Sequence, residues 1–326
     1  MRYILQRMNG NIFARPMDVM ENITGVTSFL KEKIIKAGGD ELRETLTVIF
    51  SKDGKPLYQD ADGDCWRMYY MIEDAMCYDK VETEEDFYES AKAFGKFGHL
   101  LSDYPAETLH ETIPGFHDTR ARFEVFQRAV EADVCGRAEE AAAEIHFFQE
   151  RKDITGVLGQ MQAEGKLPLR VTHNDTKLNN IMMDKKTGKG ICVIDLDTVM
   201  PGLSVHDFGD SIRFGASTGA EDEPDLSRVE LDLSLFETFT EGFIKGCAGS
   251  LTDLEIEMLP MGAKLMTYEC GIRFLADFLD GDVYLKIHRD GHNLDRARTQ
   301  FKLVADMEEK WGEMAAIVKK CKEKLN

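Results

Sequence analysis

An acid, an amide and a second acid lie close together near the middle of the chain, and these residue types can hold a metal ion and orient a hydroxyl group. Asp175 and Asn180 belong to the polar stretch HNDTKLNN, and Asp195 ends a run rich in β-branched residues. Carboxylate and amide oxygens are ligands that Mg²⁺ accepts in proteins. The three residues therefore suit a site that binds Mg²⁺ and positions a substrate hydroxyl.

The elements around these residues must bring them together. An apolar pair, Ile181-Met182, precedes a Lys/Gly turn at Lys185–Gly190, and the apolar run Ile191–Ile194 follows it. Short apolar runs on both sides of a glycine-containing turn predict a β-hairpin. In such a hairpin the two acids and the amide meet at one end, so we expect them to form a single site.

The spacing is that of a protein-kinase catalytic loop. That loop runs H-R-D-x-x-x-x-N, with the Asp on the substrate hydroxyl and the Asn on a metal, and a later D-F-G Asp binds the bridging metal. His173, Asp175 and Asn180 fall in this register. Lys177 stands two residues after the Asp, where protein kinases often place a phosphate-binding Lys, and Asp195 takes the place of the later Asp. The residues after Asp195 are Leu-Asp in place of Phe-Gly.

This departure resembles the small-molecule kinases of the aminoglycoside phosphotransferase superfamily, whose second Asp lies in an I-D-x context. Within that superfamily, THNDTKLNN, VIDLDTVMPG, HDFGD and the opening YILQRMN look most like the N-acetylhexosamine 1-kinases. The resemblance extends over nearly the whole chain. It implies an α+β, protein-kinase-like two-lobe fold with ATP and Mg²⁺ as cofactors. The implied reaction is phosphorylation of the anomeric hydroxyl of N-acetylglucosamine or N-acetylgalactosamine.

The resemblance also implies roles for individual residues. Asp175 is expected to orient the hydroxyl and accept its proton. Lys177 is expected to contact the transferring phosphate, and Asn180 and Asp195 to hold Mg²⁺. The candidates for sugar binding are Asp197, Arg273 and Tyr284, and the residues expected to brace the catalytic loop are His173 and Asp207.

The beginning of the chain predicts the strand and helix of a nucleotide-binding lobe. A strand is expected over Arg2–Met8, and apolar residues at helical spacing predict a helix over Met17–Lys36. A kinase-like strand here carries a phosphate-binding Lys, but the alternation of the strand puts Gln6 at that position, with Arg7 adjacent. Glu21 is the candidate for the acid of the helix, and a solvated helix charge is the alternative.

Kinase-like folds place a glycine-rich hairpin before this strand to cover the phosphates. None precedes it in this sequence, and a start at this strand would leave an unpaired sheet edge. We therefore expect a truncated start, with a genuine loss of the phosphate lid as the alternative. Glu73 and Ala75 lie at the expected interlobe hinge, where backbone groups can bind adenine. The predicted division is a nucleotide-binding N-lobe over residues 1–75 and a helical C-lobe over 76–326, which contains the catalytic hairpin at 171–208.

Other elements follow from periodicity and turn residues. Leu46–Ser51 and Cys65–Glu73 predict strands, and Thr83 begins a helix with a capping-box-like start. Met200-Pro201-Gly202 predicts a turn, and the acidic, glycine-containing Phe214–Leu226 predicts a mobile loop. Further helices are expected within Phe116–Arg151 and over Ile154–Gln162, Leu233–Lys245, Asp253–Leu279 and from Leu294 to the C-terminus.

The composition limits the possible partners. A formal net charge of -19 argues against nucleic-acid or anionic-membrane binding, which both need a basic face. The same charge repels ATP at long range, so local cations such as Lys177 must hold the phosphates. Seven scattered cysteines show no disulfide framework or metal spacing, which favours a reduced, cytoplasmic compartment. We expect a small-molecule sugar substrate, no nucleic-acid or membrane partner, and a monomer or weak dimer.

Two other functions remain open at this point. One is a kinase of the same fold that acts on an aminoglycoside, choline, homoserine or another sugar, and the acids at 220–226 would suit a cationic acceptor. The other is a non-catalytic nucleotide-binding protein, which Gln6 and the missing glycine-rich hairpin suggest. The role of Arg273 also has two readings. An Arg among apolar helix residues either pairs with a buried acid or faces a substrate.

Overall fold

The computed structural model describes residues 2–325, and the ends of the predicted first lobe and last helix, Met1 and Asn326, lie outside these residues. The chain divides into two compact units, each assembled from separate stretches of sequence. The first contains the residues up to Phe116, Leu169–Asp207 and Glu241–Thr252, and the second contains His117–Pro168, Phe208–Thr240 and the residues from Asp253 onward. The predicted lobes, 1–75 and 76–326, are a functional division and stay a prediction.

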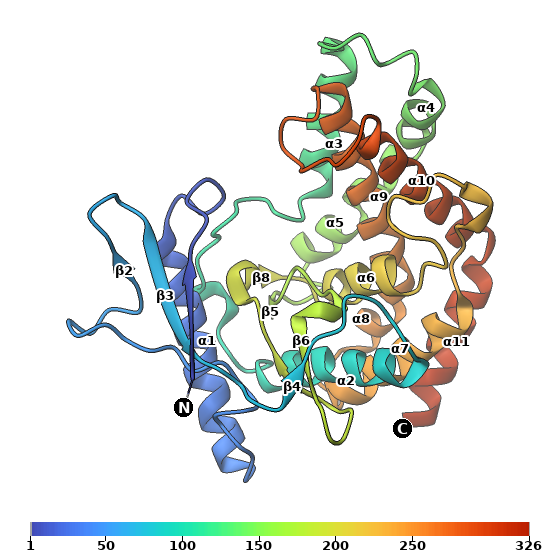
Figure 1. The fold of residues 1–326 in the computed structure, drawn as a ribbon. Coiled ribbons are helices and arrows are strands. Elements are labelled where there is room, and N and C mark those ends of the chain that lie inside the picture. Colours follow the sequence, from blue (N-terminus) through green and yellow to red (C-terminus); the bar gives the residue numbers. More distant parts are fainter. Residues whose placement is uncertain (1, 326) are drawn as a thin grey trace. The chain divides into compact units, whose positions relative to one another are not determined.

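An antiparallel three-stranded sheet opens the first unit (blue in Figure 1). Strand β1 (Tyr3–Arg7) pairs with β3 (Cys65–Tyr70), and β3 pairs in turn with β2 (Tyr58–Gln59). Strand β1 lies at the edge of this sheet, and all five of its residues are exposed. The two predicted strands that contain β1 and β3 are confirmed, although β3 ends three residues early.

The strand predicted at Leu46–Ser51 is wrong. This segment contributes one isolated bridge to β3, between Val48 and Tyr69, and the chain then enters a turn. The Ser51 hydroxyl donates to the carbonyl oxygen of Lys55 across that turn, at 3.0 Å. Apolar alternation continues through the segment, but the backbone ladder does not.

Helix α1 (Pro16–Lys36) follows the prediction closely and begins with Pro in its first turn, a position where the missing N–H costs nothing. It buries an apolar stripe that includes Val19, Ile23 and Val26. Its Asn22 is also buried and donates from Nδ2 to the carbonyl oxygens of His110 at 2.9 Å and Val199 at 3.0 Å. This amide ties α1 to the segment that follows Asp195.

The predicted catalytic hairpin is confirmed. Strands β6 (Ile181–Asp184) and β7 (Gly190–Val193) pair antiparallel, and β4 (Ala75–Met76) adds to the β6 side. Helix α2 (Glu84–Leu100) starts with the predicted capping box of Thr83 and packs against the hairpin at Gly190. A Cβ at Gly190 would lie 2.9 Å from a side-chain carbon and a backbone oxygen of α2, so the close approach requires glycine.

Two elements beside the hairpin were not expected. Residues 200–202, predicted as a turn, form strand β8 (Met200–Gly202), which pairs with β5 (Arg170–Thr172). Pro201 is tolerated because each strand of a two-stranded sheet is an edge strand, where a residue can lack an N–H donor without breaking a ladder. Helix α6 (Ser204–Gly215) begins directly afterwards and includes the HDFGD stretch, and α7 (Leu233–Cys247) follows later in the chain.

The second unit is built from helices. Its core is a cluster of aromatic and aliphatic side chains around α9 (Leu259–Leu279). Tyr268 of this helix is fully buried and donates its hydroxyl to the carbonyl oxygen of Phe148 at 2.6 Å. The helices of this unit are α3 (Thr119–Ala132), α4 (Ala142–Glu150), α5 (Val157–Ala163), α8 (Asp253–Glu257), α9 (Leu259–Leu279), α10 (His292–Glu309) and α11 (Trp311–Leu325). Short 3-10 helices complete the chain at Ala106–Thr108, Lys152–Gly156, Leu178–Asn180, Leu196–Thr198 and Leu226–Arg228. A search of residues 2–325 for a helix long and apolar enough to cross a membrane finds none.

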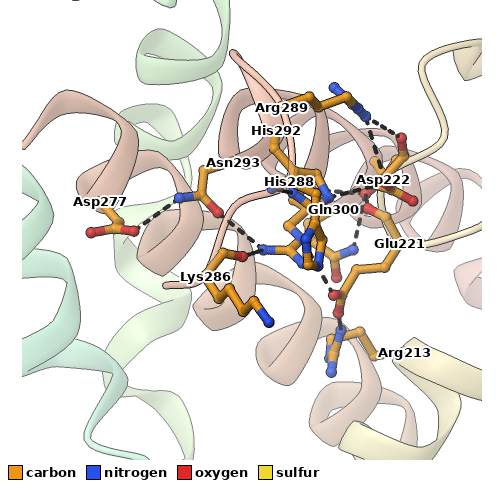
Figure 2. A network of polar contacts seen from close by, with 12 residues as sticks. Arg213, Glu221, Asp222, Asp277, Lys286, His288, Arg289, His292, Asn293 and Gln300 are labelled. Atoms are coloured by element: carbon orange, nitrogen blue, oxygen red, sulfur yellow. Dashed lines mark hydrogen bonds and ion pairs between the residues drawn. The ribbon is translucent and has the colours of Figure 1, made fainter. Parts of the chain in front are cut away.

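The acidic segment predicted to be mobile is anchored by ion pairs within the second unit (Figure 2). The buried guanidinium of Arg213 donates to Glu221 at 2.7 Å, and Arg296 lies 3.8 Å from the other oxygen of Glu221. His292 on α10 contacts Asp222 at 3.0 Å, and Arg289 lies 3.6 Å from the same carboxylate. Both acids therefore have internal counter-charges.

Candidate active site

His173 joins the catalytic loop to the end of strand β7. Its ring is fully buried, where Nδ1 accepts the backbone N–H of Asp175 at 3.3 Å and Nε2 lies 2.8 Å from the carbonyl oxygen of Ile194. With Nδ1 as an acceptor, Nε2 is the ring nitrogen that donates to the Ile194 carbonyl oxygen. Phe94 packs edge-on against this ring, with centroids 5.7 Å apart. The structure thus places His173 as a structural link and not as a base.

Asp207 braces the same loop from the first turn of α6. Its two carboxylate oxygens accept the backbone N–H groups of His173 at 2.8 Å and Asn174 at 2.7 Å. Asn174 adopts a left-handed backbone conformation, with φ of 66°, and donates from Nδ2 to the carbonyl oxygen of Thr198 at 2.8 Å. A loop fixed by these bonds presents the next residue, Asp175, in one defined position.

The structure brings Asp175, Lys177 and Asn180 together. The ammonium group of Lys177 lies 2.8 Å from Oδ1 of Asp175. The Asn180 amide nitrogen donates to the backbone oxygen of Asp175 at 2.7 Å and approaches its Oδ2 at 3.3 Å. Because the Asn180 amide nitrogen donates to Asp175, the amide oxygen is the side-chain atom of Asn180 that can bind a metal.

Asp195 follows β7 and joins this group. The backbone N–H of Ile194 donates to the backbone carbonyl oxygen of Asn180 at 2.9 Å, so the hairpin register fixes Asp195 beside the loop. Its φ of 58° is left-handed, a conformation that Asp tolerates better than most residues. Burial raises the pKa of Asp195 most, and the charges of Asp197 and Asp175 add to this rise, while His173 and Arg67 oppose it without reversing it. A carboxylate so crowded by other acids suits a divalent cation, so the residues present fit a metal.

Arg67 is the main site residue that sequence reasoning missed. It lies on β3 with 7% of its surface exposed, forms an ion pair with Asp197, and donates from Nε to the Gln6 side-chain oxygen at 3.2 Å. Its guanidinium also lies over the ring of Tyr69, 5.4 Å from the centroid. A signal was present, since a neutral residue at the expected lysine position invites a search for a cation on the neighbouring strand.

Three predicted nucleotide-site residues lie apart from this group. Glu21 is half exposed and contacts the His110 ring at 2.8 Å. Glu73 forms an exposed ion pair with Arg2 at 2.9 Å. Ala75 lies in β4, where its backbone pairs with β6.

Arg273 and Tyr284 belong to the second unit. Arg273 lies on α9 one turn after the buried acid Glu269, which accepts hydrogen bonds from His117 at 2.8 Å and Thr119 at 2.6 Å. Burial alone would raise the pKa of Glu269, but these two bonds and the charges of His117 and Arg273 lower it to about 2. Arg273 is thus within electrostatic reach of a buried acid.

A second arginine lies close to Arg273. Burial and the Arg273 charge lower the pKa of Arg122 on α3. Tyr284 has 70% of its surface exposed, and its backbone N–H donates to Asp277 at 2.8 Å. The Tyr284 side chain is therefore available to a ligand without disturbing the core.

The chain is similar to known phosphotransferases in sequence and in structure. Residues 55–239 match the model of the phosphotransferase enzyme family (APH). A microcompartment-associated aminopropanol kinase is similar in structure, with 15% identity, a TM-score of 0.56, and coverage of 96% of this chain and 87% of that chain. An amicoumacin kinase in complex with AMP-PNP, Ca²⁺ and Ami has 14% identity, a TM-score of 0.55, and coverage of 94% and 82%.

An ethanolamine kinase of Plasmodium vivax is also similar, with 14% identity, a TM-score of 0.51, and coverage of 91% of this chain and 75% of that chain. At such identities the likeness concerns the fold. The predicted α+β, protein-kinase-like fold, with a small sheet-containing part and a larger helical part, is confirmed.

Proposed function

The chain belongs to the phosphotransferase enzyme family, and from that premise we propose that it transfers the γ-phosphate of ATP to the anomeric hydroxyl of an N-acetylhexosamine. The observation that carries the proposal is the meeting of Asp175, Asn180 and Asp195 at one end of the β6–β7 hairpin. The choice of sugar is supported by the motifs THNDTKLNN and VIDLDTVMPG, which resemble those of N-acetylhexosamine 1-kinases.

We assign the proton transfer to Asp175. Its carboxylate would orient the sugar hydroxyl and accept its proton as the new bond to phosphorus forms. Lys177, which contacts this carboxylate, would place a positive charge beside the transferring phosphate. Positioning and electrostatics of this kind provide most of the catalysis in phosphoryl transfer, so the rigid bracing by His173 and Asp207 matters as much as the acid itself.

Asn180 and Asp195 would hold Mg²⁺. The Asn180 nitrogen is committed to Asp175, and the raised pKa of Asp195 marks a site with excess negative charge. Bound Mg²⁺ neutralises charge that develops between the phosphates. For ATP we retain the predicted positions at Gln6 and Glu21 and the hinge backbone at Glu73 and Ala75.

Two residues of the second unit are proposed for the acceptor. Arg273 and Tyr284 could both donate hydrogen bonds to a neutral sugar, and the exposed Tyr284 hydroxyl is accessible. The same role for Asp197 would depend on its second carboxylate oxygen, because Arg67 contacts the first.

A kinase for an amino alcohol or an aminoglycoside is the second candidate. The names of the similar aminopropanol and ethanolamine kinases favour it. A cationic acceptor needs free acidic groups, and the segment that contains Glu221 and Asp222 was the obvious source. Arginines within the second unit form ion pairs with both carboxylates, and the His292 ring also contacts Asp222, which supports a neutral acceptor (Figure 2).

Acceptor-dependent ADP release tests these candidates. The protein is incubated with Mg·ATP alone and with N-acetylglucosamine, N-acetylgalactosamine, aminopropanol, ethanolamine or an aminoglycoside. We expect release only with the two N-acetylhexosamines, and a product that has lost its reducing end because the anomeric oxygen carries the phosphate. Asp175→Asn is the matched control for contaminating kinases. Release with an amine-bearing acceptor instead would establish the second candidate, and nucleotide binding without any turnover would favour a binding protein.

A further inference from the structure

Arg67 is a buried cation in a place where the sequence pattern offers none. We infer that Arg67 of β3 binds the phosphates of the nucleotide, in place of a lysine at position 6 of the neighbouring strand. The inference rests on the proposed use of ATP. It assigns the phosphate contact to a different strand of the sheet, and so to a residue that the kinase pattern does not indicate.

The strand register makes the exchange possible. Gln6 of β1 and Arg67 of β3 are direct partners in the antiparallel pair, so their side chains project from the same face of the sheet. The hydrogen bond from Arg67 Nε to the Gln6 oxygen, at 3.2 Å, shows that both side chains reach the same point. A long Arg side chain can therefore deliver its charge to the position that a lysine on β1 would serve.

The residue at position 6 is suited to this arrangement. A lysine there would put a second positive charge within hydrogen-bonding distance of Arg67, and like charges at that separation repel. The neutral Gln6 instead accepts a hydrogen bond and orients the guanidinium. Gln6 and Arg67 thus form a consistent pair, with a neutral acceptor on β1 and the cation on β3.

The local charges also require a cation here. Asp195 and Asp197 both lie within electrostatic range of Arg67, and Asp175 adds to the negative charge around Asp195. An acidic cluster without a cation would repel phosphates, and the protein as a whole is strongly acidic. Arg67 and Lys177 both form ion pairs with this cluster. Burial strengthens the electrostatic effect of Arg67, because water screens a buried charge less.

The guanidinium has donors to spare. It carries five N–H groups, of which Nε serves Gln6 and one on Nη1 serves Asp197. Among the residues that the structure describes, the remaining three find no hydrogen-bond acceptor. Arginine binds phosphate through such paired donors, with both direction and charge. Asp197 then keeps the side chain in place, and the Tyr69 ring supports its flat face.

The inference is tested by how nucleotide affinity depends on the number of phosphates. Binding of AMP, ADP and ATP is measured calorimetrically with Mg²⁺ and without acceptor, so that no turnover occurs. In the wild type we expect affinity to rise from AMP to ATP. In Arg67→Gln we expect ATP to bind roughly 10-fold to 100-fold more weakly, the range for a lost charge-assisted hydrogen bond, with AMP unchanged. Arg7→Gln on β1, which removes an exposed cation paired with Asp64, is the matched control and should leave all three affinities unchanged.

A purely structural role, in which Arg67 only neutralises Asp197, makes a different prediction. The double variant Arg67→Gln with Asp197→Asn removes the buried pair together, which is less disruptive than leaving one charge alone. It therefore also serves if Arg67→Gln does not fold. If Arg67 binds phosphates, the double variant still prefers ATP over AMP less than the wild type does. A double variant with the wild-type preference would overturn the inference.

Moving the cation back gives a positive test. In Gln6→Lys with Arg67→Gln, the charge returns to β1, and we expect the preference for ATP over AMP to recover at least in part. The outcomes separate this inference from the proposed function. A wild type that binds no Mg·ATP would overturn both, whereas a wild type and an Arg67→Gln variant with the same phosphate dependence would overturn only the role of Arg67.

Discussion

The carboxylate of Asp207 accepts the backbone N–H of His173 at 2.8 Å, a bond that joins the start of α6 to the start of the catalytic loop. The second oxygen of the same carboxylate accepts the next N–H group, at 2.7 Å. His173 in turn holds the end of β7 through its ring. Because these bonds are largely buried, the position of the proposed base depends on one side chain that need not touch a substrate.

Replacing Asp207 should therefore reduce both stability and turnover. Asp207→Ala leaves two backbone donors without their acceptor, and we expect a loss of about 1–3 kcal/mol in the free energy of unfolding for each donor that water cannot reach. We also expect a lower kcat with little change in the KM for ATP. Asp207→Asn keeps one acceptor oxygen and should fall between Ala and the wild type. Equal kcat in all three proteins would show that the brace does not position the loop.

Asp175→Asn tests the proposed base directly. The amide cannot accept the hydroxyl proton, so we expect kcat to fall by at least ~100-fold, the lower range for general acid–base groups. Circular dichroism should show an unchanged fold, since Asn keeps the size of the side chain. Asp103→Asn, at an exposed position, is the matched control. Near-full activity in Asp175→Asn would remove this residue from the role.

Asp195→Asn should stabilise the metal-free protein while abolishing activity. The folded pKa of Asp195 lies above its ordinary value, so the folded state binds more protons than the unfolded state as pH rises through this range. Ionised Asp195 thus lowers stability at neutral pH. Asn removes the charge and tolerates the same left-handed backbone, so we expect the metal-free Tm to rise by a few degrees.

Magnesium provides the control for that prediction. Addition of Mg²⁺ should raise the Tm of the wild type, because a ligand that binds the folded state stabilises it. The Asp195→Asn variant should respond much less. A variant with a lower metal-free Tm than the wild type would contradict the account of Asp195 as a strained, crowded carboxylate.

The buried His117–Glu269 pair should make stability depend on pH in two directions. The pKa of Glu269 falls from 4.5 to about 2 in the folded state. Ionised Glu269 therefore adds to the free energy of unfolding above pH 4.5, and this stabilisation is lost as pH falls toward 2. Burial opposes protonation of His117, but the charge and hydrogen bond of Glu269 together with the charge of Asp210 outweigh it and raise the pKa above 6.5. The stabilisation that protonated His117 gives to the folded state is therefore fully present below pH 6.5, and it is lost as pH rises through the folded pKa.

Urea unfolding at a series of pH values checks the direction of these stability changes. The stability difference between the wild type and His117→Gln should be largest between pH 4.5 and 6.5 and should shrink on both sides. The exposed pair His146–Glu150 offers the control, since His146→Gln should change stability very little at any pH. A constant difference between pH 3 and pH 9 would mean that the pair is not ionised.

Tyr284→Phe tests the proposed acceptor contact. The side chain is largely exposed, so its hydroxyl can be removed without loss of stability. We expect the KM for the sugar to rise by roughly 3-fold to 10-fold, the value of one neutral hydrogen bond, with the KM for ATP unchanged. Tyr58→Phe, also exposed, serves as control. An unchanged KM for every acceptor would exclude Tyr284 from binding.

The local patterns that predicted the hairpin and the long helices were reliable because each carried its own signal. Thr83 begins α2 through a capping box, and Ile181–Asp184 and Gly190–Val193 enclose an unmistakable turn. The spacing within the catalytic loop also predicted that Asp175 and Asn180 would meet, since their contact depends on a five-residue turn.

Features that depend on distant partners were not predictable in this way. Helix α6 contains Gly209, where a Cβ would lie 2.3 Å from the backbone oxygen of Gly262. The packing of α6 against this backbone, and not its helix propensity, therefore explains why the helix forms. Strand β8 exists because Thr172 and Met200 pair across a long connection. The burial of Arg67 between Trp66 and Met68 was not predictable either, because alternation identifies two faces of a strand but not which one is covered.

The exposed strand β1 bears on how the protein should be handled. Its five residues include Tyr3, Ile4 and Leu5, all well exposed, and β3 is its one partner strand in the described sheet. An apolar edge with open backbone groups can add a strand from a neighbouring molecule. The protein should therefore aggregate through this edge first when it is concentrated. Leu5→Lys should keep concentrated solutions monodisperse for longer.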